Sequence, residues 1–300
     1  MLRAPKDLRD LMVENLAYQW EVDSIASRSF SYLLTPFITN TEFSRSQNKF
    51  QEIEGTHAAT YSEIVRLCIS DPTLVYRKIL ENKEIDIRLK PIFDALDDLL
   101  IAGAKYVQGF YKRDSQELYN IVFKGYIAMY LLERIQFMGS FASTFITAEH
   151  NYFIGICKLI QKIAIDEFRF HARQGHFIIS SCLADDPRAV KALDMLKPEL
   201  QLLYNSILEA EYAWTRKALK GKQIVGLTAD LAINWIDFNA QEANQLLQLS
   251  SQNLIITNPL KWMEHWLNPD NTQQAQQEGD NTNYQKVFIK EDLNNEVLEF

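Results

Sequence analysis

Residues 54–61 read Glu54-Gly-Thr-His57-Ala-Ala-Thr-Tyr61, and the interpretation of the whole chain starts from this stretch. Glu54 and His57 are three residues apart and Tyr61 follows four residues later, so a helix would place all three side chains on one face. A carboxylate, an imidazole and a phenol on the buried face of a helix require partners. A metal ion is one such partner. A single E-x-x-H pair is also common as a surface pair or as a satisfied core histidine. Residues elsewhere in the chain must therefore show whether this pair binds metal.

The composition is that of a folded, acidic protein. Of the 300 residues 47% are hydrophobic, and the small numbers of Gly (10) and Pro (8) exclude a fibrous or wholly disordered chain. The net charge of −8 argues against nucleic-acid binding, because phosphate groups would be repelled. The three cysteines form no C-x-x-C pair, which predicts free thiols in a reducing compartment rather than disulfides.

Neither a secretory signal nor a membrane span is predicted. The first residues lack the apolar run of a signal peptide. The most apolar region, about 118–165, is interrupted by charged side chains, and no stretch of 18 uncharged apolar residues occurs in the chain. We therefore expect a cytoplasmic protein that does not enter a membrane.

Apolar residues recur every three or four positions, and strand signals are nearly absent, which predicts an all-α bundle of long helices. The predicted helices span about 7–34, 42–69, 74–83, 85–113, 115–148, 151–182, 187–219 and 228–251. From residue 269 the sequence becomes polar and low in complexity, which is typical of disorder. The chain is therefore predicted to consist of a helical domain, 1–268, and a flexible tail, 269–300.

Four of the long helices carry an acidic residue among apolar neighbours, and two of these acidic residues are followed by a histidine. Taken singly, each is more readily explained as a surface acid or a packed core residue. Together, in the order carboxylate, carboxylate with histidine, carboxylate, carboxylate with histidine, they match the ligand pattern of dinuclear carboxylate bundles. The predicted metal ligands are Asp23, Glu54, His57, Glu133, Glu167 and His171.

Three further stretches have a recognisable pattern. They are Tyr18-Gln-Trp-Glu-Val-Asp23-Ser-Ile, Leu132-Glu133-Arg-Ile-Gln-Phe137-Met-Gly-Ser-Phe141 and Asn258-Pro259-Leu-Lys-Trp262. Together with residues 54–61 they resemble the small, radical-generating subunit of class I ribonucleotide reductase, and the resemblance runs almost end to end. The first two look like the family's first-ligand and third-ligand helices, and the last resembles the segment that closes the domain.

The resemblance implies a ferritin-like bundle in which two iron ions react with O2 and oxidise Tyr61 to a neutral radical. Mn/Fe and Mn/Mn pairs use the same ligand types, so the residues do not distinguish the metals. Phe137 and Phe141 would separate the tyrosine from water. Asp166 would hold His57 through a hydrogen bond outside the metal ligands.

The resemblance also implies partners. The radical would pass through Glu278 and Tyr284 in the tail to a separate large subunit, where the ribonucleotide is reduced. The last residues look like the peptide that docks on that subunit, and the family implies a homodimer. Family members usually also relay an electron through a tryptophan that lies before the point where this chain begins, and Trp20 is the candidate substitute.

The fourth ligand motif departs from the family pattern. The family has D-E-x-x-H, whereas here three residues separate Glu167 from His171. A local π-bulge would absorb the extra residue and turn His171 back towards Glu167. Without a bulge, Phe170 would occupy the ligand position and His171 would point away.

Two other functions remain open at this stage. One is a different ferritin-like dinuclear oxidase that acts on a small substrate, and the other is a metal-binding relative without radical chemistry. Tyr61 and the spacing of Glu278 and Tyr284 favour the reductase subunit, because neither alternative needs them.

Overall fold

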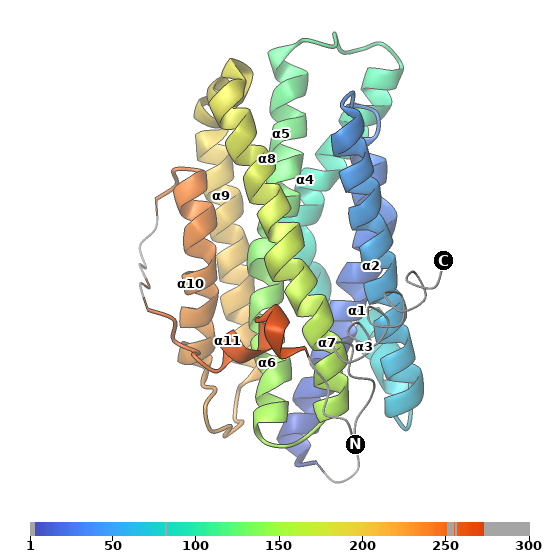
Figure 1. The fold of residues 1–300 in the computed structure, drawn as a ribbon, viewed down its shortest axis with the longest axis vertical. Coiled ribbons are helices and arrows are strands. Elements are labelled where there is room, and N and C mark those ends of the chain that lie inside the picture. Colours follow the sequence, from blue (N-terminus) through green and yellow to red (C-terminus); the bar gives the residue numbers. More distant parts are fainter. Residues whose placement is uncertain (1–3, 82, 251–254, 256, 273–300) are drawn as a thin grey trace, which may run out of the picture.

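The longest helices run side by side along the long axis of the molecule (Figure 1). The computed structural model describes residues 4–81, 83–250, 255 and 257–272. Within these ranges there is no β-strand, so the all-α prediction is confirmed. None of the helices in this part of the chain is long and apolar enough to cross a membrane.

Helices α1 (Lys6–Leu34) and α2 (Thr41–Cys68) form a tightly packed hairpin. The first ends just before Pro36, as predicted. Asn40 caps the second, because its side chain accepts a hydrogen bond of 2.7 Å from the backbone N–H of Phe43. The short connection brings the middle of α1 beside the middle of α2, where residues 54–61 lie.

Two further rods complete the core, and each is interrupted by a π-helical turn. One rod comprises α5 (Gln116–Leu131), the π turn η1 (Leu132–Gln136) and α6 (Phe137–Glu149). The other comprises α7 (Ile154–Asp166), the π turn η2 (Glu167–His171) and α8 (Ala172–Asp185). The predicted helices 115–148 and 151–182 correspond to these rods. A π-bulge was considered only for the second of them. The two π turns contact each other, so both irregularities lie at the same level of the bundle.

The remaining helices surround this four-rod core. They are α3 (Thr73–Glu81), α4 (Lys83–Val107), α9 (Pro187–Ala218), α10 (Ala229–Leu246), the short α11 (Met263–Trp266) and the 3₁₀ turn η3 (Pro269–Asn271). Helix α4 packs on α5 and α9, and α10 packs on α6 and α9. Two predicted ends were wrong. The helix expected to reach residue 113 stops at Val107 before Gly109, whose φ is 85°, and the helix expected to reach 251 stops at Leu246.

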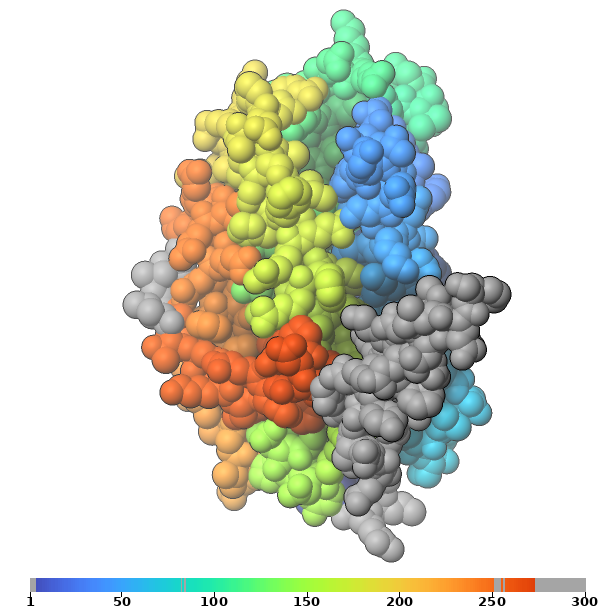
Figure 2. Space-filling view, in the orientation of Figure 1, coloured from blue at the N-terminus to red at the C-terminus, as the bar shows by residue number. Residues whose placement is uncertain are grey.

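An aromatic stack runs along α6 inside the bundle. The fully buried rings of Phe137, Phe141 and Phe145 stack in sequence on α6, with centroid distances of 5.6 and 6.0 Å. Trp266 of α11 extends the stack, because its ring lies 4.6 Å from that of Phe145 and its indole N–H donates to Glu149. The segment containing α11, orange-red in Figure 2, is thereby fixed against α6 and α7.

The predicted boundary at residue 269 coincides with the last described turn, η3. Residues 273–300 of the predicted tail, with Glu278 and Tyr284, lie outside the described residues. The division into a domain and a tail therefore stays a prediction.

Candidate metal centre

The four core rods bring the six predicted ligands together. Asp23 comes from α1, Glu54 and His57 from α2, Glu133 from η1, and Glu167 and His171 from η2. All six side chains are buried, with exposed fractions of at most 2%. Residues separated by up to 148 positions (171 − 23) thus meet inside a hydrophobic core.

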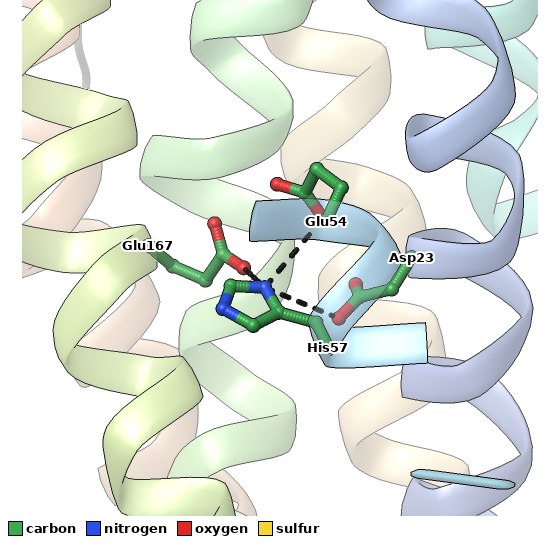
Figure 3. Close-up of side chains that lie close together, drawn as sticks. All are labelled: Asp23, Glu54, His57 and Glu167. Atoms are coloured by element: carbon green, nitrogen blue, oxygen red, sulfur yellow. Dashed lines mark ion pairs between the residues drawn. The ribbon is translucent and has the colours of Figure 1, made fainter. Parts of the chain in front are cut away.

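One half of the cluster surrounds the imidazole of His57 (Figure 3). Its Nδ1 lies 2.9 Å from Oε1 of Glu167, 3.6 Å from Oε2 of Glu54 and 3.7 Å from Oδ2 of Asp23. Ligand atoms of these four residues all lie within 4.8 Å of one another, which is the spacing required to surround a single cation.

The other half of the cluster surrounds the imidazole of His171. Its Nδ1 lies 2.7 Å from Oε2 of Glu167 and 2.8 Å from Oε1 of Glu54, although only the contact with Glu167 has hydrogen-bond geometry. Glu133 completes this group, and the ligand atoms again lie within 4.8 Å of one another. Glu54 and Glu167 belong to both halves, so the arrangement offers two positions with two carboxylates in common.

The polar atoms of this cluster are not satisfied by the protein alone. Both carboxylate oxygens of Asp23, Glu54 and Glu133 are buried without a hydrogen-bond partner. Burying ionised carboxylates without partners is strongly unfavourable. Divalent cations would satisfy these oxygens, and mixed carboxylate and imidazole donors suit iron and manganese. The residues present therefore fit a dinuclear metal site.

The electrostatics of the metal-free cluster reflect crowded negative charge. Burial, together with the charges of Glu54 and Glu167, raises the pKa of the Asp23 carboxyl well above its usual value. Burial, Glu167 and Glu54 do the same to the pKa of Glu133. Burial would also raise the pKa of Glu167, but the nearby imidazoles of His171 and His57 outweigh it and lower that pKa.

The pKa values of the two imidazoles are raised, whereas burial alone lowers the pKa of a histidine. Burial alone would lower the pKa of His57, but Glu167 and hydrogen bonds with Asp166 and Glu167 raise it well above its usual value. For His171, Glu167 and Glu54 outweigh burial and raise the pKa to about 9. In the absence of metal the surrounding carboxylates therefore favour protonation of both rings.

The π turn η2 resolves the register of the fourth motif. The extra residue is absorbed by the wider turn, as the π-bulge prediction required. His171 faces inwards with 2% of its surface exposed, whereas Phe170 is 58% exposed. The alternative register, with Phe170 at the ligand position, was wrong.

Deleting Phe170 is expected to leave metal binding almost unchanged, because it removes the outward residue and converts the π turn into a regular α turn. The helix segments on either side would keep their registers, so the midpoint of thermal unfolding should move by only a few degrees. Metal content per chain and thermal unfolding measure this. Deletion of the buried Ile179 in regular α8 is the control, and it should prevent folding by rotating the following segment out of the core. Loss of metal from the Phe170 deletion would contradict the prediction.

Tyr61 and Asp166 both lie beside the cluster. The side chain of Tyr61 is fully buried, and its hydroxyl has no hydrogen-bond partner. Burial and the charges of Asp23, Glu167 and Glu54 raise the pKa of this phenol. Asp166 lies 3.1 Å from Nε2 of His57, which leaves Nδ1 directed at the carboxylates.

Sequence reasoning missed one side chain of the cluster. The ring of Phe50 stacks on the imidazole of His171 with a centroid distance of 3.8 Å and fixes its plane. Phe50 precedes Glu54 by four residues on α2, so the helical spacing contained the signal. The second π turn, η1, was also missed, because Glu133 has no neighbouring histidine whose spacing could reveal an extra residue.

Known proteins share both the sequence pattern and the fold. The family "Ribonucleotide reductase, small chain" matches residues 4–259. The ribonucleoside-diphosphate reductase subunit beta of Haemophilus influenzae is 28% identical over 291 residues, which cover 93% of this chain and 77% of the relative. Ribonucleoside-diphosphate reductase 1 subunit beta of Escherichia coli O157:H7 is also 28% identical, with the same coverage.

Solved structures show the same architecture. The ribonucleotide reductase R2 subunit from Clostridium botulinum superposes with a TM-score of 0.74 at 19% identity, covering 88% of this chain and 78% of that chain. This likeness confirms the predicted ferritin-like bundle. Since the family match spans most of the sequence, the chain belongs to the small-chain family of ribonucleotide reductase, an oxidoreductase.

Proposed function

We propose that this chain is the radical-generating small subunit of a class I ribonucleotide reductase, in which the six buried residues hold two metal ions and Tyr61 carries the radical. The observation that carries this proposal is a pair of four-residue groups that share Glu54 and Glu167, with the unpartnered hydroxyl of Tyr61 buried close to the same carboxylates. We propose iron as the metal. The donor types serve Mn/Fe and Mn/Mn pairs equally well.

The protein's contribution to such a site is to fix its donors. Glu54 and Glu167 would hold the two ions close together, with Asp23 and His57 at one position and Glu133 and His171 at the other. Asp166 keeps the ring of His57 oriented through Nε2. Bound metal ions would supply the O2-dependent oxidation that this chain's side chains alone do not perform.

Tyr61 is a neutral phenol near neutral pH, as an ordinary tyrosine is, and its raised pKa disfavours ionisation further. Loss of one electron together with the phenolic proton would leave a neutral radical on the ring. The carboxylates of Asp23, Glu167 and Glu54, whose charges already act on this phenol, are the candidate proton acceptors. We propose that Phe137 and Phe141, both fully buried, help to exclude water and reductants from the radical.

The family further supports a large subunit as the partner, on which the ribonucleotide would be reduced. We propose that the last residues of the chain dock on that subunit and that Glu278 and Tyr284 carry the radical across. Two copies of the chain would form a homodimer. These proposals rest on the sequence pattern of the tail and on the family.

Electron paramagnetic resonance (EPR) of the metal-free protein reconstituted with Fe(II) and air tests the proposal. We expect a tyrosyl signal in the unaltered chain and its complete loss in Tyr61→Phe, with metal content unchanged. Tyr284→Phe is the matched control. It should keep the signal and lose ribonucleotide reduction in the presence of a large subunit. A signal that persists in Tyr61→Phe would refute the assignment to this residue.

The same experiment separates the alternatives. Two bound irons without any radical signal would favour the metal-binding relative without radical chemistry, once manganese loading had given the same result. An oxidase acting on a small substrate would need a cavity that reaches the cluster. The apolar cavity of about 410 Å³ between α1, α2, α5 and α8 is lined by none of the six predicted ligands, so it does not favour that function.

A further inference from the structure

A second buried ion pair lies behind the metal cluster. Arg88 of α4 and Glu211 of α9 are at most 1% exposed, and no sequence motif had singled them out. Nε of Arg88 donates to Oε1 of Glu211 at 2.5 Å and Nη2 donates to Oε2 at 2.7 Å. Two parallel charge-assisted hydrogen bonds of this kind fix both the distance and the plane of the guanidinium.

Two aromatic rings lie against the guanidinium of Arg88. Its Cζ lies 3.4 Å from the ring centroid of Tyr18 on α1 and 4.0 Å from that of Trp214 on α9. Contact of a desolvated guanidinium with two aromatic rings is favourable and leaves it little freedom to move. Arg88 is therefore held by α1 and α9 at the same time as it bonds to Glu211.

Two hydrogen bonds connect Arg88 with the π turn η1, and Tyr18 adds a third bond to the same turn. Nη2 of Arg88 donates to the backbone carbonyl of Gln136 at 2.9 Å, and the hydroxyl of Tyr18 donates to the same carbonyl at 3.3 Å. In return, the side-chain amide of Gln136 donates to the backbone carbonyl of Arg88 at 2.7 Å. Gln136 is the last residue of η1 and follows Glu133 by three positions.

A π turn needs such support, because its hydrogen-bond pattern is less favourable than that of an α-helix and rarely persists without an external reason. The carbonyl of Gln136 receives donors from two other helices. The following helix also approaches the pair closely, because a Cβ added at Gly139 would lie 3.4 Å from Oε2 of Glu211. The hydrogen bonds at Gln136 therefore hold the backbone where the π turn ends, and Glu211 packs closely against the helix that follows.

A gain in stability does not explain well why a charged pair is buried here. A buried ion pair is seldom more stable than well-packed apolar side chains of similar volume, because the desolvation of both charges offsets their attraction. The fixed position of its hydrogen-bond donor explains the buried pair better. The ion pair offers a fixed donor at a position where an apolar residue could not bond to the carbonyl of Gln136.

We propose that Arg88 and Glu211 are positioning residues for the metal site: they anchor the carbonyl of Gln136, hold the register of η1 and so fix where the carboxylate of Glu133 stands. This inference rests on the proposed function, in which Glu133 is a metal ligand. Its structural half, the anchoring of η1, is independent of metal.

The double variant Arg88→Met/Glu211→Met tests the proposal, because it removes both charges while keeping the volume apolar. Its thermal unfolding midpoint should stay within a few degrees of the unaltered protein. In the metal-free state, amide hydrogen exchange over residues 132–141 should become at least about tenfold faster, since the anchor of the turn is lost. Titration with Mn(II), followed by the EPR signal of the free ion, should show one of two positions weakened about 10–100-fold.

Lys124→Met on the same rod is the matched control, since Lys124 pairs with Asp98 and Glu199 near the surface. It should change neither exchange nor Mn(II) binding. Unchanged exchange and unchanged Mn(II) affinity in the double variant would overturn the proposal and leave the pair as packing only.

If the double variant does not fold, Tyr18→Phe provides the test. It removes one donor to Gln136 and should speed amide hydrogen exchange in the same segment. Failure of the unaltered protein to bind two Mn(II) ions would count against the proposed function, and the exchange result would still decide the anchoring.

Discussion

Replacing Glu167 with glutamine is expected to weaken metal binding at both positions by more than about 100-fold, because changes outside the ligand shell already cost 10–100-fold. The reason is that this carboxylate belongs to both halves of the cluster. Its two oxygens lie 2.9 Å from the imidazole of His57 and 2.7 Å from that of His171. Glutamine has the same shape but no negative charge, so the loss would report the missing charge rather than a cavity. Metal content per chain after dialysis measures it.

Glu133→Gln is the matched comparison, since Glu133 lies in only one of the two groups. We expect this variant to keep one ion and lose the other. Glu63→Gln, an exposed residue of α2, should keep both. If Glu167→Gln and Glu133→Gln lost the same amount of metal, the two-position arrangement with common carboxylates would be wrong.

The metal-free protein should become less stable as the pH rises from about 6.5 to about 9. His171 has a folded-state pKa of about 9 against an ordinary value of 6.5, so its contribution is fully present below 6.5 and is lost as the pH rises through 9. The expected decrease in the free energy of unfolding is on the order of 3 kcal/mol. The raised pKa values of His57, Asp23 and Glu133 act in the same direction.

The contribution of Glu167 to the free energy of unfolding changes with pH in the opposite direction, because its folded-state pKa is lowered. Its contribution is present above the ordinary carboxyl pKa and is lost only in strong acid, outside this window. Urea denaturation of metal-free protein at the two pH values measures the effect, and His171→Gln should show a shallower dependence. The metal-loaded protein should not show the decrease, because metal ligands bind as neutral imidazoles and ionised carboxylates. A metal-free stability that stays constant or rises over this range would contradict the assigned shifts.

The sequence predicted those parts of the site that lie within one helix or follow a known spacing. Glu54, His57 and Tyr61 share a helical face. The extra residue before His171 allowed either a π turn or a displaced histidine, and η2 is the first of these. The turn η1 could not be predicted in this way, since a lone Glu133 leaves the local register undetermined.

The buried ion pair between Arg88 and Glu211 could not be predicted from the sequence, for a different reason. Arg88 and Glu211 are 123 positions apart, and each lies in an ordinary amphipathic helix where a charge normally faces solvent. The direct packing of α4 on α9 brings them together, and the sequence does not show which helices are neighbours. The end of α4 at Val107 was missed because the polar residues near Arg113 gave a stronger stop signal than Gly109.

Trp266 has a consequence beyond packing. Its stacking on Phe145 and its bond to Glu149 fix the last described segment to α6, the same rod that continues into η1 and Glu133. The point from which the chain continues past residue 272 therefore keeps a constant position relative to the metal cluster. A partner that binds residues further along the chain is then tethered to the metal cluster by a covalent connection. Its effective local concentration at the cluster depends on the length of the intervening chain, because the point of attachment does not move.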